Sequence, residues 1–397
     1  MSALEESKST APLVLGSISN AGEPIRIEGV ERLAGFTLEA AKPGQQAKVA
    51  TRMALTSDDS TFHPLVAELE RVVSGMASGA GRHVDLRRVD RFLLVFKADN
   101  SAELWLDTAA VTLLCLTKRA VKVATAIFEN DIADVTRMTF PCVNLAETDA
   151  VLCLFREGWS FGLAFDFNPN GRLNLDAFWT TLGTLHRTLR YRSLYDATSD
   201  PRIFEGVLNA GWFPFAEIIT AEFRELVGHV AAGFDLGEFE AKLVAAFDDA
   251  RLAHLLERWA AKPHFAAKGV LLKEAIDAFK GERPASVIKI VLTEIEGILN
   301  DAHRATHGGA GAKLKQLLEF ARASAEVRAG GANTLLFPAA FARYLSVHTF
   351  ANFDPVSQTG TAGSRHAVGH GAAAQDTYTM TRALQALLTL DQLAFYT

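Results

Sequence analysis

The chain has 397 residues, of which 49% are hydrophobic and 22% are charged, and its formal net charge is −6. A chain of this length and composition is typical of a globular protein with about two or three domains. The acidic balance argues against a protein that coats nucleic acid non-specifically, and no DNA partner is expected. A local basic site for a selected nucleic acid is compatible with this charge.

The cysteines and the N-terminal segment predict a cytoplasmic location. Cys115, Cys142 and Cys153 are odd in number and form no C-x-x-C pair, which favours reduced thiols. Residues 1–10 lack the basic start and apolar core of a signal peptide. No apolar run approaches the roughly 20 residues of a membrane helix. We therefore expect no membrane partner, and residues 1–20 are expected to be poorly ordered.

The region 21–170 is predicted to be a β-rich domain. Residues 91–96 and 102–106 are strand-like and flank the turn-favouring pair Asp99-Asn100. Further strands are expected at 111–116, 121–126, 135–140, 150–155 and 161–167. Short strands at this spacing indicate a sandwich or a partly open barrel. The sequence Asn168-Pro169-Asn170-Gly171 interrupts the pattern, so a boundary is placed near residue 170.

From residue 176 onward the apolar period becomes helical, which predicts an α+β fold class. Phe178, Leu182, Leu185 and Leu189 share one helix face. Residues 171–275 are expected to form a helical connecting region. Helices are predicted at about 216–231, 236–256, 270–279, 313–328, 338–348 and 379–396. A further helix is predicted from about 284 through 299, and the glycine-rich stretch 308–311 ends it. The glycine-rich stretch 308–311 lacks the G-x-x-x-x-G-K-[ST] pattern of a phosphate loop, and no cofactor is expected.

The candidate site lies near the C-terminus, where a helix is expected to begin after a Gly/Thr-rich turn. The sequence from Arg365 to Gly371 reads Arg-His-Ala-Val-Gly-His-Gly. Arg365 is suited to a forked pair of hydrogen bonds with phosphate oxygens, which a helix N-terminus also attracts. His370 can exchange a proton near neutral pH, and His366 adds a polar group. Residues five apart lie about 140° apart around a helix, so Arg365 must reach round or act with His370 of a second subunit.

Two other Arg-x4-His matches occur in the chain, Arg224…His229 and Arg343…His348. The first lies on an ordinary amphipathic helix, and the second lies in an apolar helix where a partly buried histidine is expected. Around the candidate site the sequence is locally basic, with more basic than acidic residues between 313 and 371. The basic residues are Lys313, Lys315, Arg322, Arg328, Arg343 and Arg365, against Glu319, Glu326 and Asp354.

The segment 365–371, followed by a polar stretch and a helix that ends Leu-Asp-Gln-Leu at 390–393, resembles the end of HEPN-domain proteins. Their Arg-x4-6-His motif commonly has a polar residue after the arginine and a glycine after the histidine. The sequence Leu-Thr-Glu-Ile-Glu-Gly-Ile-Leu at 292–299 resembles a segment that precedes this motif in some members. The resemblance implies a HEPN-like all-α helical bundle over residues 276–397. It also implies a homodimer that places two motifs in one cleft.

Many HEPN proteins are metal-independent endoribonucleases that act as toxins or in antiviral defence. Carried over to this chain, Arg365 would bind the scissile phosphate, His370 would transfer protons, and His366 would be the supporting polar residue. The implied partners are an RNA substrate and an antitoxin or another regulatory protein. Some members keep the fold without cleaving RNA, so a non-catalytic RNA- or protein-binding role is the main alternative.

Two further alternatives come from other parts of the chain. His303…His307 and His366…His370 have the i, i+4 spacing of metal-binding pairs, which would fit a metal-dependent hydrolase. There is no H-E-x-x-H sequence and no third ligand can be assigned, so no metal is expected. Aromatic residues of the β-rich region could line a recognition surface, but such residues are more typical of a sheet core. They include Trp105, Trp159, Phe161, Phe165 and Phe167.

Overall fold

The computed structural model describes residues 22–79, 81, 83–354, 359–360, 364–369 and 371–397. The predicted disorder of residues 1–20 and the predicted role of His370 fall outside these residues. The chain forms two compact units. Unit 1 comprises residues up to Thr112 and Met138–Leu185, and unit 2 comprises Leu113–Arg137 and His186–Thr397. Among the described residues, no helix combines the length and apolar character that spanning a membrane requires.

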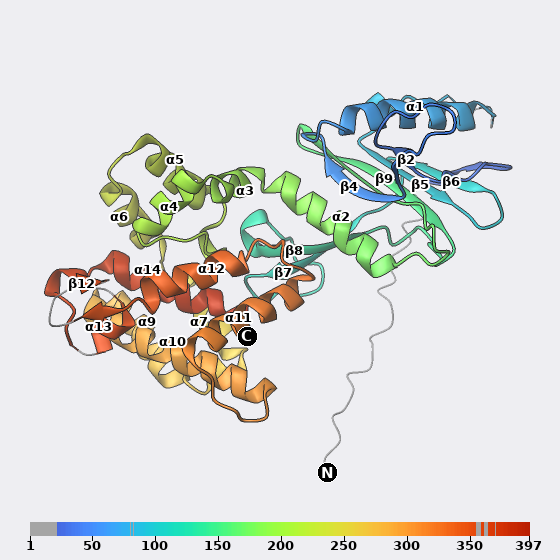
Figure 1. The fold of residues 1–397 in the computed structure, drawn as a ribbon. Helices are drawn as coiled ribbons and strands as arrows, with labels where there is room; N and C mark the ends of the chain where they lie inside the picture. The colour runs from blue at the N-terminus through green and yellow to red at the C-terminus, as the bar shows by residue number, and fades with distance from the viewer. Residues whose placement is uncertain (1–21, 80, 82, 355–358, 361–363, 370) are drawn as a thin grey trace, which may run out of the picture. The chain divides into compact units, whose positions relative to one another are not determined.

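Unit 1 is built on a six-stranded antiparallel sheet with the order β1-β6-β5-β9-β10-β4 (Figure 1). The turn between β5 and β6 uses Asp99 and Asn100 as predicted, and Asn100 adopts a left-handed φ of 63°. A two-stranded pair, β2 and β3, completes the strands of the unit. The strands are β1 Ile25–Ile27, β2 Phe36–Thr37, β3 Val49–Ala50, β4 Arg52–Thr56, β5 Arg91–Phe96, β6 Ala102–Leu106, β9 Ala150–Glu157 and β10 Ser160–Asp166.

Helix α1, Phe62–Gly79, covers one face of this sheet. It buries Leu65, Leu69 and Val73, which recur at the spacing of one helix face. They pack in one cluster with Phe92 and Leu94 of β5. The alternate residues of β5 are also fully buried, so the opposite face is covered as well. Figure 1 shows the first turns of α2, Leu175–Arg190, on that side.

The sheet is therefore a single layer between helices, and the predicted sandwich or partly open barrel is wrong. The difference arises because α1 supplies the apolar cover that a second sheet would provide. The predicted strand at 121–126 is also absent. Ala124 there adopts a φ of 64°, which a strand cannot accommodate, and the Lys122 backbone N–H donates to Thr125 Oγ1. Trp105, Phe165 and Phe167 lie in the core as predicted, whereas Trp159 is 93% exposed.

Unit 2 combines helices with the strand pairs β7–β8 and β11–β12, which confirms the mixed α+β class. A hairpin pairs β7, Thr112–Thr117, with β8, Ile132–Thr139, and its residues 113–137 belong to unit 2. The compact units thus differ from the expected division at residue 170. Within 276–397 the structure also contains the short strands β11, Phe353–Asp354, and β12, Thr359–Gly360, so the described part of this region is not all-α.

In unit 2, α10 and α14 pack against each other and α9 packs on α10 (Figure 1). Twelve consecutive residues of α14, from Ala383 to Ala394, are buried. The helices are α3 Arg192–Ser199, α4 Pro201–Asn209, α5 Ala221–Ala232, α6 Gly237–Ala246, α7 Asp249–Ala260, α8 Pro263–Ala266, α9 Gly269–Lys280, α10 Pro284–Thr306, α11 Leu314–Ala329, α12 Pro338–Tyr344, α13 Arg365–Gly369 and α14 Met380–Ala394.

A buried ion pair fixes the hairpin within unit 2. Asp134 of β8 accepts a hydrogen bond of 3.2 Å from Arg187 Nη1 of α2, and both side chains are at most 1% exposed. Thr334 Oγ1 donates to the other carboxylate oxygen, and Arg187 also donates to the Asn333 carbonyl. Because all the charge is paired and hydrogen-bonded, removal of either partner would leave an uncompensated buried charge.

Candidate functional site

The motif segment folds as a single helical turn. Helix α13 contains only Arg365–Gly369, because Gly371 adopts a left-handed φ of 66° and turns the chain. Ser364 is fully buried, and its hydroxyl accepts a hydrogen bond of 3.3 Å from the Ala367 N–H. The helix expected to begin here does begin at Arg365, but it is a single turn, and the anion expected at its N-terminus stays a prediction. A one-turn helix has little dipole, and its first N–H groups are in part satisfied by Ser364.

The side chains of α13 divide between the bundle and a cavity. Ala367 and Val368 are buried toward the helices, and α13 packs against α10. Arg365, His366 and Gly369 line a cavity of about 580 Å³. The other lining residues come from α10, from the start of α11, and from the residue after a π-helical turn at Leu345–Thr349. They are Thr293, Glu296, Leu314 and Phe350.

The guanidinium group of Arg365 is held by a carboxylate. Arg365 Nη2 lies 2.8 Å from Glu296 Oε2, and the two side chains are 39% and 31% exposed. The Arg365 Nε atom is buried and has no hydrogen-bond acceptor among the described residues. Within the described part of the chain, Arg365 thus has one donor without an acceptor while its Nη2 is anchored to α10. A buried unsatisfied donor at a cavity wall is a feature that a ligand oxygen would satisfy.

The three predicted site residues have different outcomes. Arg365 and His366 are brought together at the cavity, with His366 exposed to solvent. His370 is outside the described residues, one position after the end of α13. The helical angle expected between Arg365 and His370 is not tested, because His370 is not among the described residues. The role assigned to His370 stays a prediction.

Glu296 is a site residue that the sequence reasoning did not identify. It lies in the segment 292–299, which was noted for its resemblance, but no partner was assigned to it. Its position on α10 gives a signal, because Leu292, Ile295 and Leu299 are buried and Glu296 interrupts this apolar series. The neighbouring carboxylate of Glu294 has a different partner, Lys268, at 3.4 Å.

Three of the six basic residues of this region, Arg322, Arg343 and Arg365, are held in ion pairs. Arg322 forms ion pairs of 2.6 and 2.7 Å with Glu319 and Glu326 along α11. Arg343 lies 2.5 Å from Glu205. The local excess of basic residues in the sequence therefore does not produce a continuous unpaired basic surface across these described residues. Any attraction for a polyanion depends on the remaining exposed lysines and on exchange of partners at Arg365.

The histidine pair considered for a metal site is stacked. The rings of His303 and His307 lie 4.0 Å apart and 2° from parallel. The Nδ1 atom of each is within hydrogen-bond distance of a backbone carbonyl, Ala310 for His303 and His303 itself for His307. His303 is only 9% exposed, so its ring is largely buried. In the described part of the chain, no three His, Cys, Asp or Glu side chains are grouped to hold a metal ion.

Comparison with protein-family models, with curated proteins and with solved structures found no match to this chain. The resemblance to HEPN-domain proteins therefore depends on the residues of the segments 292–299 and 365–371 themselves, and on where the fold places them.

Proposed function

We propose that the chain is a metal-independent endoribonuclease of HEPN type, which acts at the cavity lined by Arg365 and His366. One observation carries this proposal. The segments 292–299 and 365–371, separated in sequence by α11 and α12, meet at that cavity through the 2.8 Å contact of Glu296 with Arg365. Each segment was selected by its resemblance to a different part of HEPN proteins. Their meeting at one cavity is what a shared active site requires.

In the proposed reaction, Arg365 binds the non-bridging oxygens of an RNA phosphate through its remaining donors. His370, or its counterpart in a second subunit, takes the proton of the 2′-hydroxyl. The 2′-oxygen then forms a bond to phosphorus as the bond to the 5′-oxygen breaks, and a histidine donates a proton to that oxygen. The products are a 2′,3′-cyclic phosphate and a 5′-hydroxyl. His366 supports the site as a polar residue at the cavity.

The size of the cavity suits this role, since about 580 Å³ lies within the range of roughly 300–1,000 Å³ that is typical of small-molecule sites. In the same proposal, the helices from residue 276 onward form the HEPN bundle, and two copies associate so that their motifs share one cleft. An RNA is the substrate in the cytoplasm, and an antitoxin or another regulatory partner controls the activity. A role as a toxin or in antiviral defence follows from the resemblance.

A second candidate function is a non-catalytic HEPN-like protein that binds RNA or a protein partner. The Glu296–Arg365 ion pair favours this alternative, because the carboxylate occupies part of the group that would bind the phosphate. In such a protein the pair would be structural. In that case a phosphate would not displace the Glu296 carboxylate from Arg365.

The test is cleavage of 5′-labelled RNA by the purified full-length protein in EDTA, with analysis of the product ends. Arg365→Ala and His370→Ala should each lower the cleavage rate by roughly 10²–10⁴. Arg343→Ala is the matched control, because Arg343 belongs to the second Arg-x4-His match and is also held by a glutamate. It should cleave like the wild type.

Cleavage by wild type and Arg343→Ala alone, with cyclic phosphate ends, would support the nuclease. Binding of RNA without cleavage by all four folded proteins would support the non-catalytic alternative. Equal cleavage by wild type and His370→Ala would contradict the assigned proton transfer.

A further inference from the structure

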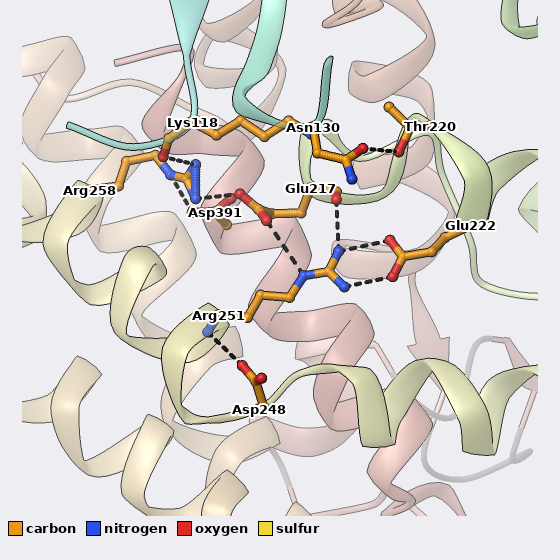
Figure 2. A network of polar contacts seen from close by, with 9 residues as sticks. All are labelled: Lys118, Asn130, Glu217, Thr220, Glu222, Asp248, Arg251, Arg258 and Asp391. Carbon is orange, nitrogen blue, oxygen red and sulfur yellow. Dashed lines mark hydrogen bonds and ion pairs between the residues drawn. The ribbon is translucent and has the colours of Figure 1, made fainter. Parts of the chain in front are cut away.

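Unit 2 contains a second polar cavity, of about 450 Å³, between the hairpin β7–β8 and helices α5 and α7 (Figure 2). Its walls carry charged side chains from segments that are far apart in the sequence. Arg251 of α7 donates hydrogen bonds of 2.6 and 2.8 Å to the two carboxylate oxygens of Glu222. Arg119 of the hairpin binds Asp131 in the same forked way, at 2.5 and 2.8 Å. Both carboxylates are thus occupied by protein donors.

The remaining carboxylates are also occupied. Arg258 Nη2 donates to Glu217 at 2.5 Å and Arg258 Nε donates to Asp391 at 3.0 Å. Asp391 also accepts a bond of 3.0 Å from the Trp259 indole. Burial raises the pKa of Asp391 to about 6, and Glu217 adds to this rise while Arg258 opposes it. The network therefore leaves few acceptors for a ligand.

Lys118 is the exception among these charged groups. It is 6% exposed and lines the cavity, and its side chain has no ion pair or hydrogen bond to any described residue. Its backbone is fixed on both sides, because its N–H donates to the Asp131 carbonyl at 2.8 Å and its carbonyl accepts from Arg258 Nη1 at 2.7 Å. Burial lowers the pKa of Lys118 to about 8. An ammonium carries three donors and no acceptor, so it requires oxygen partners.

Two other groups at this cavity that have no partner among the described residues are also donors. Asn130 Oδ1 accepts a bond of 2.7 Å from Thr220 Oγ1, which directs the side chain and leaves its amide N–H groups without an acceptor among the described residues. Figure 2 shows this amide group beside the network. Arg119 donates through Nε and Nη2 to Asp131 and Ala126, and its Nη1 has no acceptor among the described residues. A complementary ligand must therefore supply acceptors.

We propose that this cavity binds a small molecule through an oxyanion group, a phosphate or a carboxylate, anchored by the Lys118 ammonium and the Asn130 amide. The existing ion pairs explain why Lys118, rather than one of the arginines, would anchor the ligand. The three arginines are held by carboxylates and cannot turn toward the ligand without breaking an ion pair. Lys118 can bind it without losing any contact. The inference is independent of the function proposed for the Arg365 cavity.

The test is isothermal titration calorimetry of the full-length protein with phosphate, sulfate and acetate at constant ionic strength. The variants are Lys118→Met and the matched control Lys122→Met, which removes an exposed lysine from the same hairpin. Wild type and Lys122→Met should show saturable binding. Lys118→Met should bind roughly tenfold to a hundredfold more weakly, since bonds to a charged donor are lost. Asn130→Ala, at an exposed position, should give a smaller loss and tests the site without changing a buried residue.

The same experiment separates the ligand classes. Binding of phosphate and sulfate alone indicates a phosphate-bearing ligand, and binding of acetate alone indicates a carboxylate. Sulfate keeps its charge between pH 7 and 9, so its affinity should fall across this range as Lys118 loses its proton. The other groups around Lys118 are Arg119, Asp131, Glu217, Glu222, Arg251, His254, Arg258 and Asp391.

Two results would overturn the proposal. One is the absence of saturable binding of all three anions to the wild type. The other is equal binding by Lys118→Met and wild type when circular dichroism shows that both are folded. In that case Lys118 only balances the surrounding carboxylates, and its removal would change stability to the same extent with and without the anion.

Discussion

The Arg365–Glu296 pair has side chains that are 39% and 31% exposed, so both partners remain in contact with solvent. An ion pair of this exposure contributes about 1 kcal/mol or less to stability. A phosphate that accepts two charge-assisted hydrogen bonds can therefore displace the carboxylate at modest cost. At the scale of single residues, Glu296 sets how strongly Arg365 attracts an anion, and it also keeps the guanidinium at the cavity.

This balance gives a prediction for Glu296→Gln. The amide can still accept a hydrogen bond from Arg365, but the competing negative charge is gone. Given the proposed function, affinity for a 2′-O-methyl RNA, which cannot be cleaved, should rise roughly three- to fivefold. Fluorescence anisotropy at fixed salt measures this affinity.

The control is Glu294→Gln, since Glu294 lies on the same helix and pairs with Lys268 instead. It should bind the RNA like the wild type. A weaker binding of Glu296→Gln than of wild type would show that the charge of Glu296 is needed to position Arg365, contrary to the prediction.

At the scale of elements, the long helices could be predicted and the short ones could not. Helices α10 and α14 follow their expected ranges because a repeated apolar face and a bounding proline or threonine cap act together. The single helix expected at 236–256 is two helices. Asp248 breaks it, because its side chain accepts from the Arg251 N–H and starts α7. Because aspartate is a common N-cap residue, this helix start could have been predicted from the sequence.

The short elements depend on tertiary contacts. One turn of helix is not stable by propensity alone, so α13 depends on the Ser364 cap and on packing against α10. Arg365 and His366 could be selected from sequence because they are adjacent, whereas the partnership with Glu296 requires the fold. The Lys118 cavity could not be predicted from the sequence, because its walls come from four separate segments of the chain.

The contact between α4 and α5 predicts opposite changes in stability for glycine-to-alanine substitutions at two positions. Gly206 of α4 faces α5, and an added Cβ would lie 2.5 Å from Val230 Cγ1. Valine is stiff at χ1, so Gly206→Ala should destabilise the protein by about 1–3 kcal/mol despite alanine's better helix propensity. Gly228 of α5 is exposed, with no atom within 4 Å of an added Cβ.

Gly228→Ala should therefore stabilise the protein, by about 0.5–1 kcal/mol. Urea denaturation of both variants measures the two free energies of unfolding. Equal effects of the same sign would mean that the close approach of α4 and α5 does not limit the side chain at residue 206.

At the scale of the whole molecule, unit 2 is discontinuous in sequence. Its hairpin, residues 113–137, lies between two parts of unit 1 and supplies Asp134 to the buried pair with Arg187. Ala133 and Val135 of the same hairpin belong to the helical core. A domain boundary placed by composition near residue 170 could not detect this, because the hairpin has the same strand-like composition as the sheet of unit 1.

A chain of residues 171–397 is therefore expected not to fold cooperatively. It lacks the hairpin, and Arg187 would be buried without its carboxylate. Thermal unfolding followed by circular dichroism should show a broad, non-cooperative change. In the full-length chain, Asp134→Ala should lower stability by about 3–5 kcal/mol for the same reason. A sharp transition of the shortened chain near the wild-type temperature would contradict this expectation.

Helix α14 follows every other described helix in the chain, and its residues Ala383–Ala394 are buried without interruption. During translation, the centre of unit 2 must therefore remain open until α14 has left the ribosome. Helix α10, which carries Glu296, packs on α14, and this contact can form only then. For the ribonuclease proposed here, activity would appear only after synthesis of α14. This timing would protect the ribosome's own RNA from the nascent polypeptide.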